Sequence, residues 1–149
     1  MAARFPAGFE PRFEADTFLD HVGPFHHCIG EKSVQFALVV ARRHTNPAGT
    51  THGGLLMSMM DVTLGASAAR VIGHEGIVAT VQMSCNLFAA AREGDLIIGE
   101  ATVDKVTRTL SFVTGHIRCG DKVLMTASAV FRNPPDSPTR TQAPPKENP

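Results

Sequence analysis

The chain has 149 residues, of which 43% are apolar. This length and composition are typical of one globular domain whose core is large enough to fold without disulfide or metal cross-links. Its 14 basic and 14 acidic residues balance, so bulk charge indicates neither a nucleic-acid partner nor an anionic membrane.

Targeting and redox signals favour a cytoplasmic protein. The first residues lack the basic-then-apolar pattern of a secretion signal. Asp61 interrupts the longest apolar run before that run reaches membrane-spanning length. Cys28, Cys85 and Cys119 are odd in number and have no CxxC spacing, which favours reduced thiols. We therefore expect a cytoplasmic protein without a membrane partner.

Residues 1–29 are expected to form an N-terminal flank of the domain. Residues 15–22 have the pattern of a short helix, which Gly23-Pro24 ends. A His-His-Cys run follows at residues 26–28. Adjacent side chains do not easily converge on one metal ion, and no CxxC or HxxxH partner lies nearby. The sequence therefore predicts no metal site here.

Residues 30–132 contain a strand, a long apolar helix and four further strands. The first strand, residues 32–42, is rich in β-branched residues. The helix begins near residues 51–53, and Gly73 ends it. The later strands are predicted at residues 77–88, 96–106, 109–119 and 122–132. The last three are joined too closely for parallel crossovers, so they form an antiparallel meander. The proline-rich tail, residues 133–149, is expected to be disordered.

The strand at residues 77–88 shows a regular alternation of side chains. The apolar set is expected on the core face, and the polar set on the opposite face. The apolar set is Val81, Met83, Cys85 and Leu87, and the polar set is Thr80, Gln82, Ser84 and Asn86.

The long helix predicts how the domain is built. Between residues 55 and 69 it is apolar or small on nearly all sides, and Asp61 is its only charged residue. Such a helix must be enclosed rather than lie on a surface. We therefore predict an α+β fold in which a curved antiparallel sheet of five or six strands wraps one long central helix.

The start of this helix has the features of an oxyanion-binding site. The first turn of a helix leaves backbone N–H groups without intrahelical partners and with partial positive charge. Gly53 and Gly54 have no Cβ, so a substrate carbonyl can approach these groups closely. The alternative is that the two glycines only form a tight turn.

Asp61 lies too far along the helix to share a carbonyl with Gly53 of the same chain. It follows Gly53 by eight residues, which is about 12 Å at the rise of an α-helix. Two chains with antiparallel helices would bring Asp61 of one beside Gly53 of the other, so a functional site here predicts a homodimer. The alternative is that Asp61 is a buried, hydrogen-bonded anchor.

The motif Asn46-x5-His52-Gly53-Gly54-x6-Asp61 resembles that of the hotdog-fold acyl-CoA thioesterases of the PaaI-like, phenylacetic-acid-pathway type. Thr80-Val-Gln-Met after the helix and Gly94-Asp95 before the meander add to the resemblance, which covers residues 30–132. It implies a hotdog thioesterase domain over this range, an acyl-CoA substrate, and a homodimer that pairs into a dimer of dimers.

The resemblance also implies roles for individual residues. Asp61 would be the general base or nucleophile, and the Gly53 N–H of the neighbouring subunit would polarise the thioester carbonyl. Asn46 would hold the carbonyl or the attacking water, unless it is only a turn residue before proline. His52 would hydrogen-bond near the thioester sulfur or brace the loop. Thr80 would orient the water, unless it is only a strand residue.

Binding residues for the two ends of the substrate follow from the same resemblance. The expected contacts to the coenzyme A phosphates are Lys105, Arg108 and Arg92. The expected lining of the acyl pocket is Leu56, Met57, Met60, Phe25 and His26. This lining fits aliphatic and aryl groups equally well, so the sequence leaves the acyl group open.

Hydrolysis of an acyl-CoA by water activated at Asp61 is the leading interpretation. It requires a base, an oxyanion hole and a dry pocket, without a metal or redox cofactor. A hotdog hydratase or dehydratase is a second interpretation, but such enzymes pair a His with an acid in a different local pattern. A non-catalytic acyl-CoA sensor is a third, from another functional class.

Overall fold

The computed structural model describes residues 4–12 and 16–135 of the chain. Its helices are α1 (Phe18–Val22) and α2 (Gly53–Ile72), with a short 3-10 turn at Arg42–His44. Its strands are β1 (Glu10–Pro11), β2 (His26–Ile29), β3 (Val34–Val39), β4 (Ala79–Leu87), β5 (Leu96–Val106), β6 (Leu110–Cys119) and β7 (Lys122–Arg132). Most of the tail predicted at residues 133–149 lies outside the described residues.

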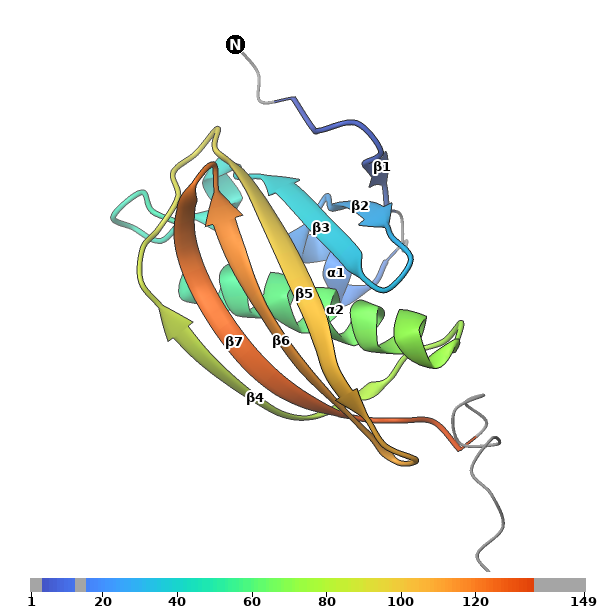
Figure 1. Ribbon diagram of the computed structural model, residues 1–149. Coiled ribbons are helices and arrows are strands. Elements are labelled where there is room, and N and C mark those ends of the chain that lie inside the picture. The colour runs from blue at the N-terminus through green and yellow to red at the C-terminus, as the bar shows by residue number, and fades with distance from the viewer. Residues whose placement is uncertain (1–3, 13–15, 136–149) are drawn as a thin grey trace, which may run out of the picture.

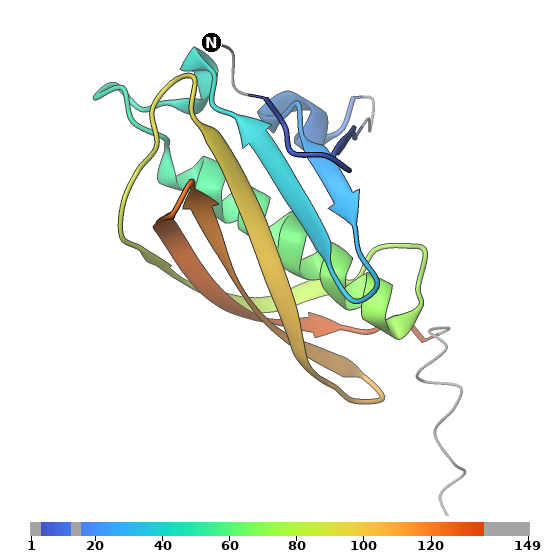
Figure 2. The same ribbon diagram turned by 45° about the horizontal axis from the view of Figure 1, so that its top comes forward.

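The strands form one seven-stranded sheet in the order β1-β2-β3-β5-β6-β7-β4, and neighbouring strands are antiparallel. The sheet curves around α2, as Figures 1 and 2 show. The predicted α+β hotdog fold is therefore confirmed. The sheet has seven strands rather than five or six, because β1 and β2 come from residues 1–29, which the sequence had suggested would only flank the domain.

Helix α2 occupies the centre of the fold. Its side chains are buried on several sides, including Leu56, Met59 and Met60. By length and hydropathy alone α2 would pass as a membrane span, but it packs inside the sheet. Its apolar composition is therefore explained by burial in the core. Removing this surface from water is the main term that holds the sheet around the helix.

Two glycines let α2 approach the sheet closely. A Cβ on Gly115 of β6 would lie 2.7 Å from Leu64 of α2 and 2.5 Å from the Glu100 carbonyl oxygen. A Cβ on Gly99 of β5 would lie 2.8 Å from the Thr63 hydroxyl of α2. Any larger side chain would push the helix outward.

Strand β4 contains a β-bulge that changes which side chains face α2. The pairing with β7 shifts between Thr80 and Gln82, so Val81 is the extra residue. Thr80 consequently faces α2, as does Met83, and both line the same groove. The alternation predicted from sequence is wrong for Thr80, because a strand without a bulge would place Thr80 and Met83 on opposite faces.

Candidate active site

Asp61 lies on α2 with one carboxylate oxygen bound by β4. The Thr80 hydroxyl donates a hydrogen bond of 2.7 Å to Asp61 Oδ1. Burial raises the pKa of the nearby Cys85 thiol, and the negative charge of Asp61 raises it further. Asp61 and Thr80, predicted to serve one reaction, are thus brought together.

The start of α2 presents one free N–H group. The helix begins after His52, whose Nδ1 accepts a hydrogen bond of 2.9 Å from the Gly54 N–H. Because Nδ1 accepts, the proton of the neutral ring is on Nε2. Within the described residues, the Gly53 N–H has no acceptor. His52 therefore caps the helix, and Gly53 keeps the donor that an oxyanion hole requires.

Asn46 uses its side chain within its own loop. Its Oδ1 accepts hydrogen bonds from the Ala48 N–H (2.9 Å) and the Thr50 N–H (3.3 Å). Its Nδ2 donates to the Thr50 hydroxyl at 3.0 Å. These bonds close the turn that leads into α2, which is the arrangement typical of an asparagine turn.

Gly53 and Asp61 are at two different places along the helix. Both lie on α2, separated by two turns or about 12 Å along its axis. One chain therefore presents two half-sites: a carboxylate with its threonine, and a free N–H at the helix start.

The carboxylate half-site opens into a groove, here called the Asp61 groove, with a volume of about 660 Å³. It runs along α2 between β4 and β7 on one side and α1 and β2 on the other. Besides Asp61 and Thr80, its lining includes the α2 residues Met57, Ser58, Val62, Gly65, Ala66 and Ala69. Its walls are formed by Phe18, Leu19, Ile29, Val34, Val78, Met83 and Phe131, and its far end by Arg70, His74, Glu75, Gly76 and Ile77. Arg12, whose guanidinium lies over the Phe36 ring, also lines the groove.

The residues predicted for the acyl pocket are divided between this groove and the core. Met57 lines the groove. Leu56, Met60 and Phe25 are buried in the core. His26 is in β2, where its ring stacks on Phe5 with 3.7 Å between ring centroids. The groove residues beyond Asp61 were not predicted, although their spacing of four residues from Asp61 indicates the same helix face.

The three cations predicted to bind phosphate lie at opposite ends of the sheet. Lys105, near the end of β5, lines a groove of about 730 Å³ with Lys32 and Arg70. Arg108 lies in the turn after β5. Arg92 precedes β5 and pairs with Thr50 close to the start of α2. The length of β5 separates the two ends by about 30 Å.

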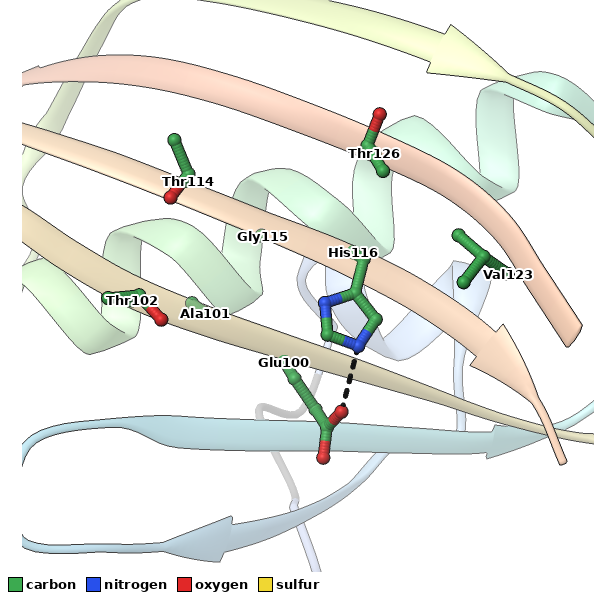
Figure 3. A pocket seen from close by; sticks show the side chains of 8 residues that line it. All are labelled: Glu100, Ala101, Thr102, Thr114, Gly115, His116, Val123 and Thr126. Carbon is green, nitrogen blue, oxygen red and sulfur yellow. Dashed lines mark ion pairs between the residues drawn. The ribbon is translucent and has the colours of Figure 1, made fainter. Parts of the chain in front are cut away.

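A second, polar hollow of about 390 Å³ lies across β5, β6 and β7 (Figure 3). In it Glu100 Oε2 is 3.0 Å from His116 Nε2. A hydrogen bond from Arg118 lowers the Glu100 pKa. Because Gly115 faces α2, its neighbour His116 points to the opposite face of the sheet. This acid–imidazole pair is therefore separated from Asp61 by the sheet.

Comparison with known proteins matches the part of the chain that contains the candidate site. The family profile of the thioesterase superfamily matches residues 48–126, which contain Gly53, Asp61 and Thr80. The Pseudomonas aeruginosa protein PA0474, provisionally named an esterase, is 32% identical over 130 residues. That alignment covers 87% of this chain and 97% of PA0474.

Solved structures show the same architecture. The conserved protein PA5202 of Pseudomonas aeruginosa superposes with a TM-score of 0.73 at 26% identity, over 80% of this chain and 94% of its own. The phenylacetic acid degradation protein PaaI of Thermus thermophilus superposes with a TM-score of 0.67 at 16% identity, over 78% of this chain and 98% of its own, which is a likeness of fold. With the family match, these findings establish that the chain belongs to the thioesterase superfamily, as a hotdog-fold hydrolase that acts on thioesters.

Proposed function

We propose that the protein is an acyl-CoA thioesterase in which Asp61 activates the attacking water. The observation that carries this proposal is the hydrogen bond from Thr80 to Asp61 Oδ1 at the side of an apolar groove. With Oδ1 held by Thr80, Oδ2 is directed to water. Asp61 takes a proton from this water while the water oxygen forms a bond to the thioester carbon. The tetrahedral intermediate then expels the coenzyme A thiolate, which is protonated. Direct attack by Asp61 would instead form a mixed anhydride and expel the thiolate. Water attack on the Asp61 carbonyl of this anhydride would then leave labelled oxygen from solvent in the Asp61 carboxylate.

The oxyanion hole in this proposal comes from a second subunit. The free Gly53 N–H is the supporting observation, because it is about 12 Å along the helix from Asp61 in its own chain. Among residues 4–12 and 16–135, β4 pairs only with β7, which leaves its other edge available to a second copy. A homodimer with antiparallel α2 helices would complete two equivalent sites.

Lys105, Arg108 and Arg92 are the proposed contacts to the coenzyme A phosphates, and because about 30 Å separates Arg92 from the other two within one chain, they would have to come from different subunits. Arg92 has the strongest support, because the loop that carries it is tied to the start of α2. The Thr51 N–H donates to the Ala91 carbonyl at 2.9 Å, and the Ala91 N–H donates to the Thr51 hydroxyl at 3.1 Å. A nucleotide bound there would lie on the subunit that provides Gly53.

An assay of thiol release from a panel of acyl-CoAs tests the function. We expect hydrolysis by the wild type, and a kcat lower by about 10²–10⁴-fold for Asp61→Asn, the usual cost of losing a general base. Asp121→Asn, in an exposed turn, is the matched control and should keep full activity. Hydrolysis that survives Asp61→Asn would overturn the mechanism, and tight coenzyme A binding without any hydrolysis would favour the sensor.

A further inference from the structure

The Asp61 groove is elongated and follows one face of α2. Its α2 lining comes in pairs spaced by four residues: Met57 and Ser58, Asp61 and Val62, Gly65 and Ala66, Ala69 and Arg70. Such spacing marks a single stripe on a helix. A site for a compact group would draw on one turn, whereas this groove follows α2 over three turns.

The groove extends unequally on the two sides of Asp61. Toward the start of α2 its helix lining ends at Met57 and Ser58, one turn away, and toward the end of α2 it continues to Arg70. Toward the end of α2, the side chains on the same face are Gly65, Ala66 and Ala69. A Cβ on Gly65 would lie 3.2 Å from the Phe131 ring, so a larger side chain there would press on that ring. An acyl group attached to a carbonyl at Asp61 therefore has the longer course toward Ala69.

The walls of this part of the groove are apolar, and its far end is polar. Val78 and Phe131 are buried on one side, and Ile29 and Phe18 on the other are 57% and 63% exposed. Large apolar side chains exposed along a groove are typical of a binding surface. Beyond Ala69 the lining changes to Arg70, His74 and Glu75, which would leave further methylene groups in a polar setting.

We propose that the Asp61 groove binds a linear, saturated acyl chain of medium length, about eight to ten carbons. The length follows from the eight residues between Asp61 and Ala69, which span about 12 Å, and from an advance of about 1.3 Å per carbon in an extended chain with ordinary C–C bonds. This inference rests on the proposed thioesterase function and specifies its substrate class.

A chain-length series tests the inference. Saturated acyl-CoAs from about four to about sixteen carbons, and phenylacetyl-CoA, would be compared by kcat/KM. We expect kcat/KM to rise by up to about fourfold for each methylene group buried, to peak at about eight to ten carbons, and to be lower for phenylacetyl-CoA. A preference for the aryl substrate, or a profile that does not depend on length, would overturn the proposal.

Ala66→Leu should narrow the groove about one turn beyond Asp61 and move the peak to about four to six carbons. Val123→Leu is the control, because Val123 is exposed on β7 and lines neither the Asp61 groove nor the groove of Lys105. Ala69→Val, a smaller change, replaces Ala66→Leu if far-ultraviolet circular dichroism shows that the latter does not fold. If neither the Ala66 substitution nor the Ala69 substitution changes the chain length at which kcat/KM is highest, the acyl chain binds elsewhere.

The inference and the proposed function fail in different ways. Asp61-dependent hydrolysis with the wrong length profile would overturn only the groove assignment. Absence of hydrolysis would overturn the proposed function, and the groove is then tested by binding. For Asp61→Asn, the dissociation constants of the same acyl-CoAs should decrease with chain length until about eight to ten carbons. Adding Ala66→Leu should shift the chain length that binds most tightly. Dissociation constants that do not depend on chain length would overturn the groove assignment.

Discussion

Thr80 holds Asp61 through one short hydrogen bond, and this bond sets the direction of the other carboxylate oxygen. A carboxylate on a helix has two rotatable side-chain bonds, so without a partner it would spend part of its time turned away from the groove. A general base must lie within hydrogen-bond reach of the water that it activates. In the proposed mechanism Thr80 therefore acts through Asp61, as a positioning residue.

Thr80→Val should lower kcat by about tenfold to a hundredfold, because hydrogen bonds to charged groups contribute about 1.5–3 kcal/mol. Thr80→Ser keeps the hydroxyl and should retain most of the activity. Steady-state kinetics on one acyl-CoA measures both. Loss in Thr80→Ser but not in Thr80→Val would mean that the methyl group, rather than the hydroxyl, matters at this position, and equal loss would mean that the hydroxyl alone does not account for the role of Thr80.

His44 joins the loop before α2 to the N-terminal segment. It is 4% exposed, its Nδ1 accepts a hydrogen bond of 2.9 Å from the Ala41 N–H, and its Nε2 lies 3.1 Å from the Gly23 carbonyl oxygen. This arrangement requires the neutral ring. Burial lowers the His44 pKa below its ordinary value of 6.5, although the hydrogen bond to Gly23 opposes the shift.

The lowered pKa predicts loss of stability in acid. Below pH 6.5 the unfolded chain protonates His44 more readily than the folded chain does, so the free energy of unfolding falls as pH falls toward the folded-state pKa. The contribution is complete above pH 6.5 and is limited to about 1.4 kcal/mol for each pH unit. The pKa values of His27 and Glu100 are also lowered and act in the same direction.

Denaturant unfolding of the wild type and His44→Gln at several pH values between about 7.5 and 5 isolates this residue. The variant should be less stable at neutral pH, because it loses the buried hydrogen bonds. Its free energy of unfolding should also fall less steeply with acid than that of the wild type. Parallel pH dependences in the two proteins would contradict the assignment to His44.

At the scale of elements, α2 is held against the sheet by contacts that leave no room for a side chain at Gly115. The tight points are Leu64 and the Glu100 carbonyl, 2.7 and 2.5 Å from a Cβ placed there. The distance between α2 and β6 therefore depends on a glycine, and this distance also sets how deep Asp61 lies relative to β4.

Gly115→Ala should lower the free energy of unfolding by about 1–3 kcal/mol, the usual cost of overpacking. Thr114→Ala, on the same strand but the opposite face, is the control, and its effect should stay within about 0.5 kcal/mol. Chemical denaturation measures both. A neutral Gly115→Ala would mean that α2 shifts away from the sheet without cost.

Strand β4 illustrates a limit of pattern reading at the level of one element. Thr80 was expected on the polar face, because alternation has a period of two residues. The bulge at Val81 adds one residue to the strand, so the side chains that precede it, including Thr80, point to the opposite face from the one that the alternation predicts. The sequence around Thr80 carries no glycine or proline to mark the bulge, which arises from pairing with β7. The family resemblance singled out Thr80, which does contact Asp61, but from the face opposite to the one that the alternation predicted.

For the whole molecule, a site shared between subunits makes a specific prediction for mixed dimers. Gly53→Pro removes the N–H group at the first helical position, where proline is well tolerated, and His52 already has the extended conformation that precedes proline (φ −67°, ψ 135°). Alone, this variant should lose about 10²–10³-fold in kcat. Gly53→Ala is the control for the added Cβ, which would lie 3.2 Å from Leu87. It keeps the N–H, so the further loss in Gly53→Pro measures the N–H group.

Refolding Gly53→Pro together with an equal amount of Asp61→Ala should restore about a quarter of the wild-type activity, because half of the dimers are mixed and each has one intact site. Neither variant alone should regain activity on the same treatment. Absence of recovery, with mixed dimers demonstrated by mass spectrometry of the native complex, would show that Asp61 and Gly53 do not act together.

The amino-acid sequence was enough to predict the long helix and the glycines at its start. It also predicted the separation of Gly53 from Asp61, because the rise of an α-helix is the same in every protein. It also indicated that a sheet must enclose this helix. The sequence could not tell which sides of the helix the sheet covers, since α2 is apolar on nearly all of them. Only the tertiary structure placed Leu56 and Met60 in the core and left the face with Asp61, Gly65 and Ala69 along the groove. Strand pairing between distant residues decides that orientation, and local patterns do not contain it.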